Sequence, residues 1–145
     1  MTDRIFIDTN LWVYLFSDDI EKRRAICELI RDNFKTIHVS SQVLGELFNV
    51  LTKKNITGLE KAQKIVDRIS NDFFVLSIDK EIVQDAITVK LRYGYSYWDS
   101  LIIASALKVE ARILYSEDLH HNHSIENKLK ILNPFVTLPH AEGIS

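Results

Sequence analysis

The sequence predicts a three-layer α/β/α fold, in which helices cover both faces of a central parallel sheet of four or five strands. Two observations predict this fold: short apolar runs alternate with longer amphipathic stretches, and the chain has 145 residues, the size of one domain. Parallel strands need long crossover connections, usually helices, and a sheet covered on both faces is built from continuous apolar runs. We therefore expect a single domain over residues 1–140, followed by a frayed tail at residues 141–145.

The expected elements follow in order along the chain. Apolar and β-branched runs predict strands at residues 4–8, 36–40, 74–78 and 112–116, with a short last candidate at 129–132. Apolar residues that repeat at intervals of three and four predict helices at residues 21–34, 41–54, 59–73, 80–94 and 97–110. Gly94 stands at the end of the fourth helix, where a glycine commonly forms the C-terminal cap.

Composition excludes several classes of function. The formal net charge is −2, from 18 basic and 20 acidic residues, which argues against a strongly basic nucleic-acid binder. The single cysteine, Cys27, allows neither an intramolecular disulfide nor a CxxC metal site. We find no signal-peptide pattern and no run of about 18 apolar residues, so we expect a cytoplasmic protein without membrane contact. The four glycines are not clustered, which excludes a glycine-rich phosphate loop.

Two aspartates are expected at one edge of the sheet. Asp8 follows the first predicted strand, and Asp118 follows the strand at residues 112–116. Ligands of open parallel sheets bind beyond the carboxyl ends of the strands, so both carboxylates should point toward the same edge. Each residue also has a structural interpretation, because Asp8 can cap the following helix and Asp118 can belong to a turn.

Two further acids lie on the apolar faces of predicted helices. Glu46 falls within a stripe formed by Val43, Leu47, Val50 and Leu51. Asp99 heads a stripe that continues with Ile102, Ile103, Ala106 and Leu107. Ser96 and Asp99 also fit a capping box, whereas Glu46 has no capping role in mid-helix and needs a partner among its apolar neighbours.

Four carboxylates gathered at one site would raise one another's pKa values unless a divalent cation neutralised them. Oxygen ligands favour hard ions, so we expect Mg²⁺, with Mn²⁺ as a substitute, rather than Zn²⁺. Such an ion can activate a water molecule and stabilise the charge that develops on a phosphodiester. Without these four acids the formal net charge would be +2, so the remaining surface tolerates phosphate.

Four motifs together resemble the PIN domain family of small metal-dependent ribonucleases, and within it the VapC-like toxins of toxin–antitoxin pairs. The motifs are FIDTN with Asp8, SSQVLGEL with Glu46, YWDSLIIASA with Asp99 and ILYSEDL with Asp118, and they span most of the chain. The resemblance implies that these four acids are catalytic. It makes Asp8, Asp99 and Asp118 metal ligands, while Glu46 binds the metal directly or through water.

The resemblance also assigns supporting residues near the fourth acid. Ser116 corresponds to the small hydroxyl residue that precedes the last acid of the family. Glu117 is adjacent to Asp118 and remains an alternative fourth acid if the turn differs. Asn10 lies two residues after Asp8 and is expected either to orient the metal-bound water or to cap a helix.

In function, the resemblance implies a Mg²⁺-dependent endoribonuclease that cleaves single-stranded or loop RNA by a metal-activated water. It further implies a toxin that forms a homodimer and is held inactive by a small antitoxin protein. An aspartate-nucleophile phosphohydrolase is an alternative, but that class requires a second acid at the position of Asn10. A non-catalytic module that binds RNA or a partner is another, and loss of one of the four acids would be its signature.

The remaining polar and aromatic clusters carry weaker signals. The HHNH segment contains three histidines, His120, His121 and His123, and is more typical of a solvated loop than of a metal site. The LWVYLF segment contributes aromatic residues for the core or a subunit contact, namely Trp12, Tyr14 and Phe16. Trp98, next to Asp99, is better placed than these to stack on a base.

Overall fold

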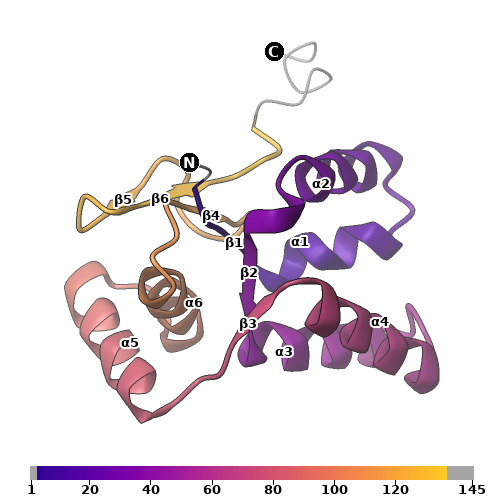
Figure 1. Ribbon diagram of the computed structural model, residues 1–145, viewed down its shortest axis with the longest axis horizontal. Coiled ribbons are helices and arrows are strands. Elements are labelled where there is room, and N and C mark those ends of the chain that lie inside the picture. Colours follow the sequence, from indigo (N-terminus) through magenta and orange to yellow (C-terminus); the bar gives the residue numbers. More distant parts are fainter. Residues whose placement is uncertain (1–2, 137–145) are drawn as a thin grey trace.

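The computed structural model describes residues 3–136, in which helices flank a central sheet (Figure 1). The helices are α1 (Thr9–Val13), α2 (Ile20–Asp32), α3 (Ser41–Lys53), α4 (Leu59–Asp72), α5 (Lys80–Tyr93) and α6 (Tyr97–Lys108). The strands are β1 (Ile5–Ile7), β2 (Ile37–Ser40), β3 (Phe74–Leu76), β4 (Ile113–Tyr115), β5 (Ser124–Ile125) and β6 (Leu129–Leu132). Single turns of 3-10 helix occur at Tyr14–Phe16 and Phe34–Thr36. In Figure 1 helices α1 to α4 lie on one side of the strands, and α5 and α6 lie on the other.

The sheet has the strand order β3-β2-β1-β4-β6-β5, and the first five of these strands are parallel. The chain moves from β1 to β2 and β3 on one side of the centre, then crosses back through α5 and α6 to β4. Strands β1 and β4 therefore lie side by side although they are far apart in sequence, and the strand order reverses between them. Such a reversal is the place where open α/β sheets bind ligands.

The three-layer fold predicted from the sequence is confirmed, and the structure adds two short elements. Strand β5 pairs antiparallel with β6 and has only two residues. Helix α1 has five residues, from Thr9 to Val13. Neither is long enough to show a period in the sequence, so the apolar pattern could not predict them. The frayed tail expected at residues 141–145 lies outside the described residues.

Polar side chains begin the helices at the expected places. Ser40 accepts a hydrogen bond from the amide of Val43 and starts α3 directly at the end of β2. Ser96 accepts one from the amide of Asp99 and starts α6. Gly94 ends α5 in the left-handed conformation, with φ of 80°, which confirms the predicted cap. The caps therefore fix the residues at which α3 and α6 begin.

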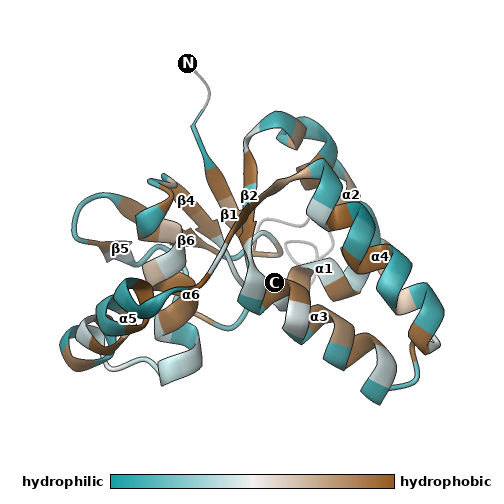
Figure 2. Cartoon of the chain, turned by 60° about the horizontal axis from the view of Figure 1, so that its bottom comes forward, coloured by the Kyte–Doolittle hydropathy of each residue, from teal (hydrophilic) through white to brown (hydrophobic). Residues whose placement is uncertain are grey.

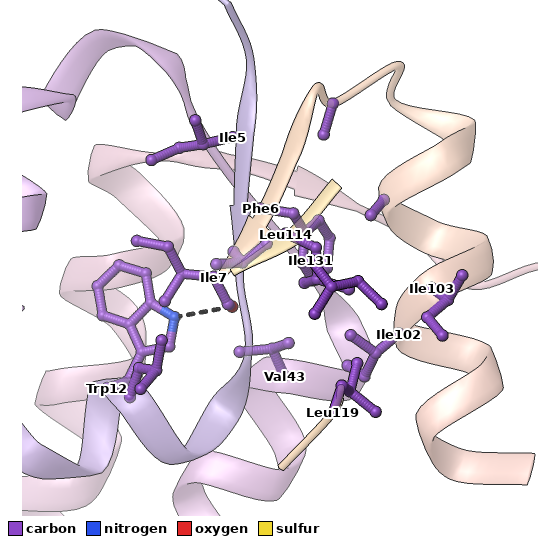
Figure 3. Close-up of a cluster of buried hydrophobic side chains, with 14 of the residues drawn as sticks. Ile5, Phe6, Ile7, Trp12, Val43, Ile102, Ile103, Leu114, Leu119 and Ile131 are labelled. Carbon is purple, nitrogen blue, oxygen red and sulfur yellow. Dashed lines mark hydrogen bonds between the residues drawn. The ribbon is translucent and has the colours of Figure 1, made fainter. Parts of the chain in front are cut away.

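Apolar residues concentrate on the strands and on the helix faces that cover them (Figure 2). The side chains of Ile5, Phe6 and Ile7 in β1 are all buried, as expected for a central strand (Figure 3). Trp12 of α1 is also buried, and its indole N–H donates to the backbone oxygen of Ile7 at 3.1 Å. This hydrogen bond fixes α1 against β1, and of the two roles expected for Trp12 the structure shows the one in the core.

A second, smaller apolar cluster joins the two helices on the other face. It contains Ile82 and Ala86 of α5 with Leu101 and Ala104 of α6. Seven consecutive residues of α6, from Ser100 to Ala106, are buried, because this helix packs against α5 as well as the sheet. None of the described helices is long and apolar enough to cross a membrane.

Candidate functional site

A pocket of about 250 Å³ at the carboxyl ends of the strands is lined by all four predicted acids, Asp8, Glu46, Asp99 and Asp118. The other residues that line it are Thr9, Asn10, Gln42, Asn49, Val50, Trp98 and Ile102. We call this hollow the acid pocket. No lysine, arginine or histidine is among these lining residues, so the described protein supplies no cation to the pocket.

The topology explains why acids far apart in sequence meet here. Asp8 follows β1 and Asp118 follows β4, and these two strands are parallel neighbours. The amide of Asp8 also donates to the backbone oxygen of Tyr115, the last residue of β4, at 3.0 Å. Glu46 lies in the second turn of α3, which starts where β2 ends, and Asp99 lies in the first turn of α6. Two strand ends and two helices each contribute one carboxylate.

Asp8 is the most buried of the four acids, with 7% of its surface exposed. One carboxylate oxygen accepts from the amide of Thr9 at 2.7 Å, and the other accepts from the hydroxyl of Ser116 at 2.9 Å. Burial raises the pKa of Asp8 to about 6; the hydrogen bonds from Ser116 and Thr9 lower it, and the charges of Asp118 and Asp99 raise it. Asp8 is therefore both the N-terminal cap of α1 and a wall of the acid pocket.

Glu46 is held by residues on two different elements. One carboxylate oxygen accepts from the hydroxyl of Thr9 at 2.9 Å, and the other accepts from the amide nitrogen of Gln42 at 3.4 Å. Thr9 thus contacts two acids at once, through its backbone to Asp8 and through its side chain to Glu46. A mid-helix acid with such partners is oriented toward the pocket rather than expelled from the apolar stripe.

The two adjacent acids after β4 have different surroundings. Asp118 lines the acid pocket and accepts a hydrogen bond from the side-chain amide of Asn10, and its backbone amide donates to the hydroxyl of Ser116. Glu117 instead accepts from the hydroxyl of Tyr14 at 2.6 Å and forms an ion pair with Lys22 at 3.1 Å. The geometry makes Asp118 the fourth acid of the pocket and leaves Glu117 outside it.

Asp99 shares the electrostatic environment of the pocket. Burial raises its pKa, a hydrogen bond with the Ser96 side chain lowers it, and the charge of Asp118 raises it. Asp118 also contributes to the raised pKa of Asp8, so three of the carboxylates are close enough to interact. The capping role that the sequence allowed for Ser96 coexists with the placement of Asp99 in the pocket wall.

The donor chemistry of the pocket fits a hard divalent cation. All the charged groups are carboxylates, and among the buried side-chain atoms of residues 3–136 the amide oxygen of Gln42 lacks a hydrogen-bond partner. An unpartnered buried acceptor costs about 1–3 kcal/mol, and a hydrated cation brings donors that could satisfy it. In the described part of the chain, no group of three or more His, Cys, Asp or Glu side chains is arranged so that it could hold a metal ion. The pocket therefore supplies oxygen donors of the kind that a hard cation prefers, without placing three of them in coordinating positions.

Sequence reasoning missed three polar residues of the pocket: Thr9, Gln42 and Asn49. Gln42 precedes Glu46 by four residues and Asn49 follows it by three, so both lie on the Glu46 face of α3. That spacing could have predicted from the sequence that Gln42 and Asn49 lie beside Glu46. Thr9 follows Asp8 directly, and its link to Glu46 depends on how α1 packs against α3, which the local sequence does not encode.

The three histidines of the HHNH segment do not line the acid pocket. His123 makes a 2.7 Å hydrogen bond with the hydroxyl of Tyr95, and the ring of His120 lies 5.3 Å from the Tyr95 ring. His121 accepts a hydrogen bond from the amide of Asn133 at 2.9 Å. These contacts attach the HHNH loop to Tyr95 and to the backbone of Asn133, which follows β6.

A larger pocket of about 880 Å³ lies at the opposite ends of β4 and β6, against α5 and α6. Its charged residues have both signs: Asp85, Lys108, Glu110, Arg112, Glu126 and Lys128. These acidic and basic residues offset one another, whereas the charged residues of the acid pocket are all carboxylates. The smaller acid pocket is therefore the candidate functional site.

A known protein family and several solved structures are similar to this chain. The model of the PIN domain family matches residues 5–123, which include all four acids of the pocket. No curated protein sequence matches the chain.

Several solved structures share the fold. The toxin VapC20 of Mycobacterium tuberculosis, described as cleaving the sarcin–ricin loop, is 22% identical with a TM-score of 0.66 over 79% of this chain and 89% of its own. A toxin–antitoxin complex from Klebsiella pneumoniae is 17% identical with a TM-score of 0.67, over 90% and 97% of the two chains. DNA-bound VapBC from Salmonella typhimurium is 18% identical with a TM-score of 0.67, over 92% and 99%. At these identities the structures show a common fold.

Proposed function

The chain belongs to the PIN domain family, and we propose that it is a Mg²⁺-dependent endoribonuclease, the toxin of a toxin–antitoxin pair. The observation that carries the proposal is the acid pocket, where four carboxylates from four elements meet with no basic residue in the lining. The similar structures include a toxin and a toxin–antitoxin complex, which supports the same assignment.

Asp8, Asp99 and Asp118 would hold the ion directly, with Glu46 as a direct ligand or one that acts through water. When bound, Mg²⁺ supplies positive charge to the phosphodiester and lowers the pKa of the attacking water. The other contacts orient these carboxylates: Thr9 and Ser116 fix Asp8, and Asn10 fixes Asp118. Partners of this kind set the direction of a ligand and tune its basicity.

The substrate proposed is single-stranded or loop RNA. Sequence-specific proteins read RNA mostly where bases are unpaired, because the edges and faces of such bases are accessible. We further propose a small antitoxin protein as a partner, a homodimer as the active assembly and the cytoplasm as the compartment. The antitoxin finds support in the toxin–antitoxin complexes among the similar structures.

The aspartate-nucleophile alternative has less support. Both carboxylate oxygens of Asp8 accept hydrogen bonds within the protein, and its side chain is buried. The position that should carry the second acid holds Asn10, whose amide donates to Asp118. The aspartate-nucleophile class requires an acid at the position of Asn10, so the surroundings of Asp8 favour the role of a metal ligand over that of a nucleophile.

The test is incubation of the purified protein with total RNA in Mg²⁺ or in EDTA, followed by mapping of the fragment ends. We expect discrete new ends in Mg²⁺ and none in EDTA. The Asp99→Asn variant should give none in either buffer. Asp85→Asn changes an exposed carboxylate outside the acid pocket and should cleave like the unmodified protein. Identical fragments from the Asp99→Asn variant would mean a contaminating nuclease or a different site.

A further inference from the structure

Trp98 is an exposed tryptophan in the wall of the acid pocket. It is 62% exposed, whereas the other tryptophan, Trp12, is 1% exposed. Large aromatic side chains normally bury most of their surface, so an exposed one in the wall of a pocket leaves a flat apolar face available to a ligand. Trp98 immediately precedes Asp99 and lines the pocket together with it.

The backbone of Trp98 is held in place by the neighbouring helix. The amide nitrogen of Gln42 in α3 donates to the backbone oxygen of Trp98 at 3.2 Å and to Glu46 at 3.4 Å. The ring of Tyr97 contacts the Trp98 ring edge-on, with centroids 5.0 Å apart. Gln42 thus links the backbone of Trp98 to a pocket acid, while most of the Trp98 surface stays open to solvent.

The charge of the pocket determines which part of an RNA can lie against Trp98. A phosphate placed beside Asp99 meets four carboxylates and no basic lining residue, so repulsion opposes it unless a cation intervenes. A nucleobase is uncharged, and its flat face can stack on an aromatic ring whatever its sequence. Such stacking strengthens binding by roughly 5- to 150-fold for each base.

We propose that Trp98 stacks on an unpaired nucleobase next to the phosphate that is cleaved, and that Gln42 positions the backbone that carries the indole. The proposal rests on the proposed ribonuclease function and adds the residue that recognises the substrate. Stacking would let an acidic site bind a polyanion, because the uncharged base adds affinity beside the acid pocket, where the carboxylates repel the phosphates. Purines present larger faces than pyrimidines, so purines should bind better at this position.

Tryptophan fluorescence tests the contact without cleavage. The cleavage-deficient Asp8→Asn variant in Mg²⁺ is titrated with oligoadenylate, with oligouridylate and with inorganic polyphosphate. Saturable quenching of the exposed, red-shifted emission is expected with oligoadenylate, weaker quenching with oligouridylate and none with polyphosphate. Replacement of Trp98 by Phe should leave only the buried emission of Trp12, which RNA does not change. Equal quenching by polyphosphate, or no quenching by any oligonucleotide, would overturn the proposal.

Kinetics on a short single-stranded RNA provide the second test. We expect Trp98→Ala to raise KM by roughly 5- to 150-fold with kcat nearly unchanged, and Trp98→Phe to restore part of the loss. Phe74 is equally exposed, at 62%, but lies on strand β3 away from the pocket, so Phe74→Ala is the matched control. Gln42→Ala should raise KM in the same direction as Trp98→Ala.

The outcomes separate this proposal from the function on which it rests. If the unmodified protein cleaves RNA and Trp98→Ala has an unchanged KM, the stacking role is wrong and the ribonuclease stands. If no cleavage occurs but oligoadenylate still quenches Trp98, RNA binding stands and the ribonuclease falls. If the emission of Trp98 instead shifts with protein concentration and Trp98→Ala abolishes self-association in sedimentation, the residue is a contact between copies and the proposal is overturned.

Discussion

Two carboxylates that are neighbours in sequence, Glu117 and Asp118, have been given opposite electrostatic surroundings. Glu117 lies in a cluster with Tyr14, Lys22 and Phe135, which we call the Glu117 cluster. There the ammonium group of Lys22 pairs with Glu117 and also lies 4.9 Å from the centres of the Tyr14 and Phe135 rings. Asp118 turns to the acid pocket, where its neighbours are other acids and the amide of Asn10.

The difference shows which acids the chain neutralises by itself. In the Glu117 cluster a cation of the protein is present, and the Glu117 carboxylate raises the pKa of Lys22 although burial alone would lower it. In the acid pocket, burial and like charges raise the pKa of Asp8 and Asp99 with no basic group in the lining. The Glu117 cluster contains its own counter-charge, whereas the acid pocket does not, and this difference supports the proposal of a metal site in the pocket.

The largest expected effect is on cleavage by variants of the acid pocket. We predict that Asp8→Asn, Glu46→Gln, Asp99→Asn and Asp118→Asn each lower the rate of RNA cleavage by roughly 100-fold or more, because each removes a ligand charge. Their melting temperatures without metal should stay the same or rise, since a like charge has been removed from a crowded site. Cleavage rates and thermal melts in EDTA measure the two effects. A sharp fall in melting temperature for all four variants would make the pocket structural, like the Glu117 cluster.

The elements that could be predicted from the sequence are those with long patterns. The apolar period of α3 extends over three turns and reveals Glu46 as an inward-facing acid, whereas Asp99 was predicted from its place at the start of the nearly continuous apolar stretch of α6. Asp8 and Asp118 were predicted because they follow apolar strands. The five residues of α1 and the two of β5 are too short for such a signal.

The hydrogen bonds inside the pocket could not be predicted from the sequence. The contact of Asn10 with Asp118 joins residues 108 positions apart, and that of Gln42 with Trp98 joins residues 56 apart. Side-chain contacts between distant segments depend on helix packing and rotamers, which a local pattern does not contain. For the same reason the sequence, which favoured Asp118 as the fourth acid, left Glu117 as an alternative, and the structure separates the two because Asp118 lines the pocket and Glu117 pairs with Lys22.

The second prediction concerns Mg²⁺ and stability. An ion that binds only the native state stabilises it by about 2.7 kcal/mol at a hundred times its dissociation constant. Millimolar Mg²⁺ or Mn²⁺ should therefore raise the melting temperature of the unmodified protein. The variant with all four acids changed to amides should not respond, while Glu117→Gln should respond fully. Equal stabilisation of the unmodified protein and the fourfold variant would show that the ion binds elsewhere.

A smaller effect is expected from pH in the absence of metal. The pKa of Asp8 is raised from 3.8 to about 6, so the folded state holds the proton more tightly than the unfolded state. The stability contributed by the protonated carboxyl is therefore lost as the pH rises from about 4 through 6. Between pH 5 and pH 7 we expect a loss of roughly 1 kcal/mol, measured by urea unfolding in EDTA. Asp8→Asn should flatten this dependence, and an unchanged slope in that variant would assign the loss to another group.

The smallest effect is predicted for Glu117→Gln. The side chains of Lys22 and Glu117 are 29% and 25% exposed, and ion pairs with this much solvent contact contribute about 0–1 kcal/mol. Glutamine keeps an acceptor for the hydroxyl of Tyr14, so only the charge is lost. The free energy of unfolding should fall by less than about 1 kcal/mol, and cleavage should stay within a few-fold of the unmodified protein.

Lys22→Met is the matched variant on the other side of the pair. It should cost more stability than Glu117→Gln, because it leaves a partly buried carboxylate without its cation and removes two contacts between the ammonium group and aromatic rings. Urea unfolding of both single variants and the double variant measures the coupling between the two residues. If Glu117→Gln abolished cleavage while Asp118→Asn did not, Glu117 would leave Lys22 for the acid pocket in the active protein, and the contrast between the two acids would be reversed.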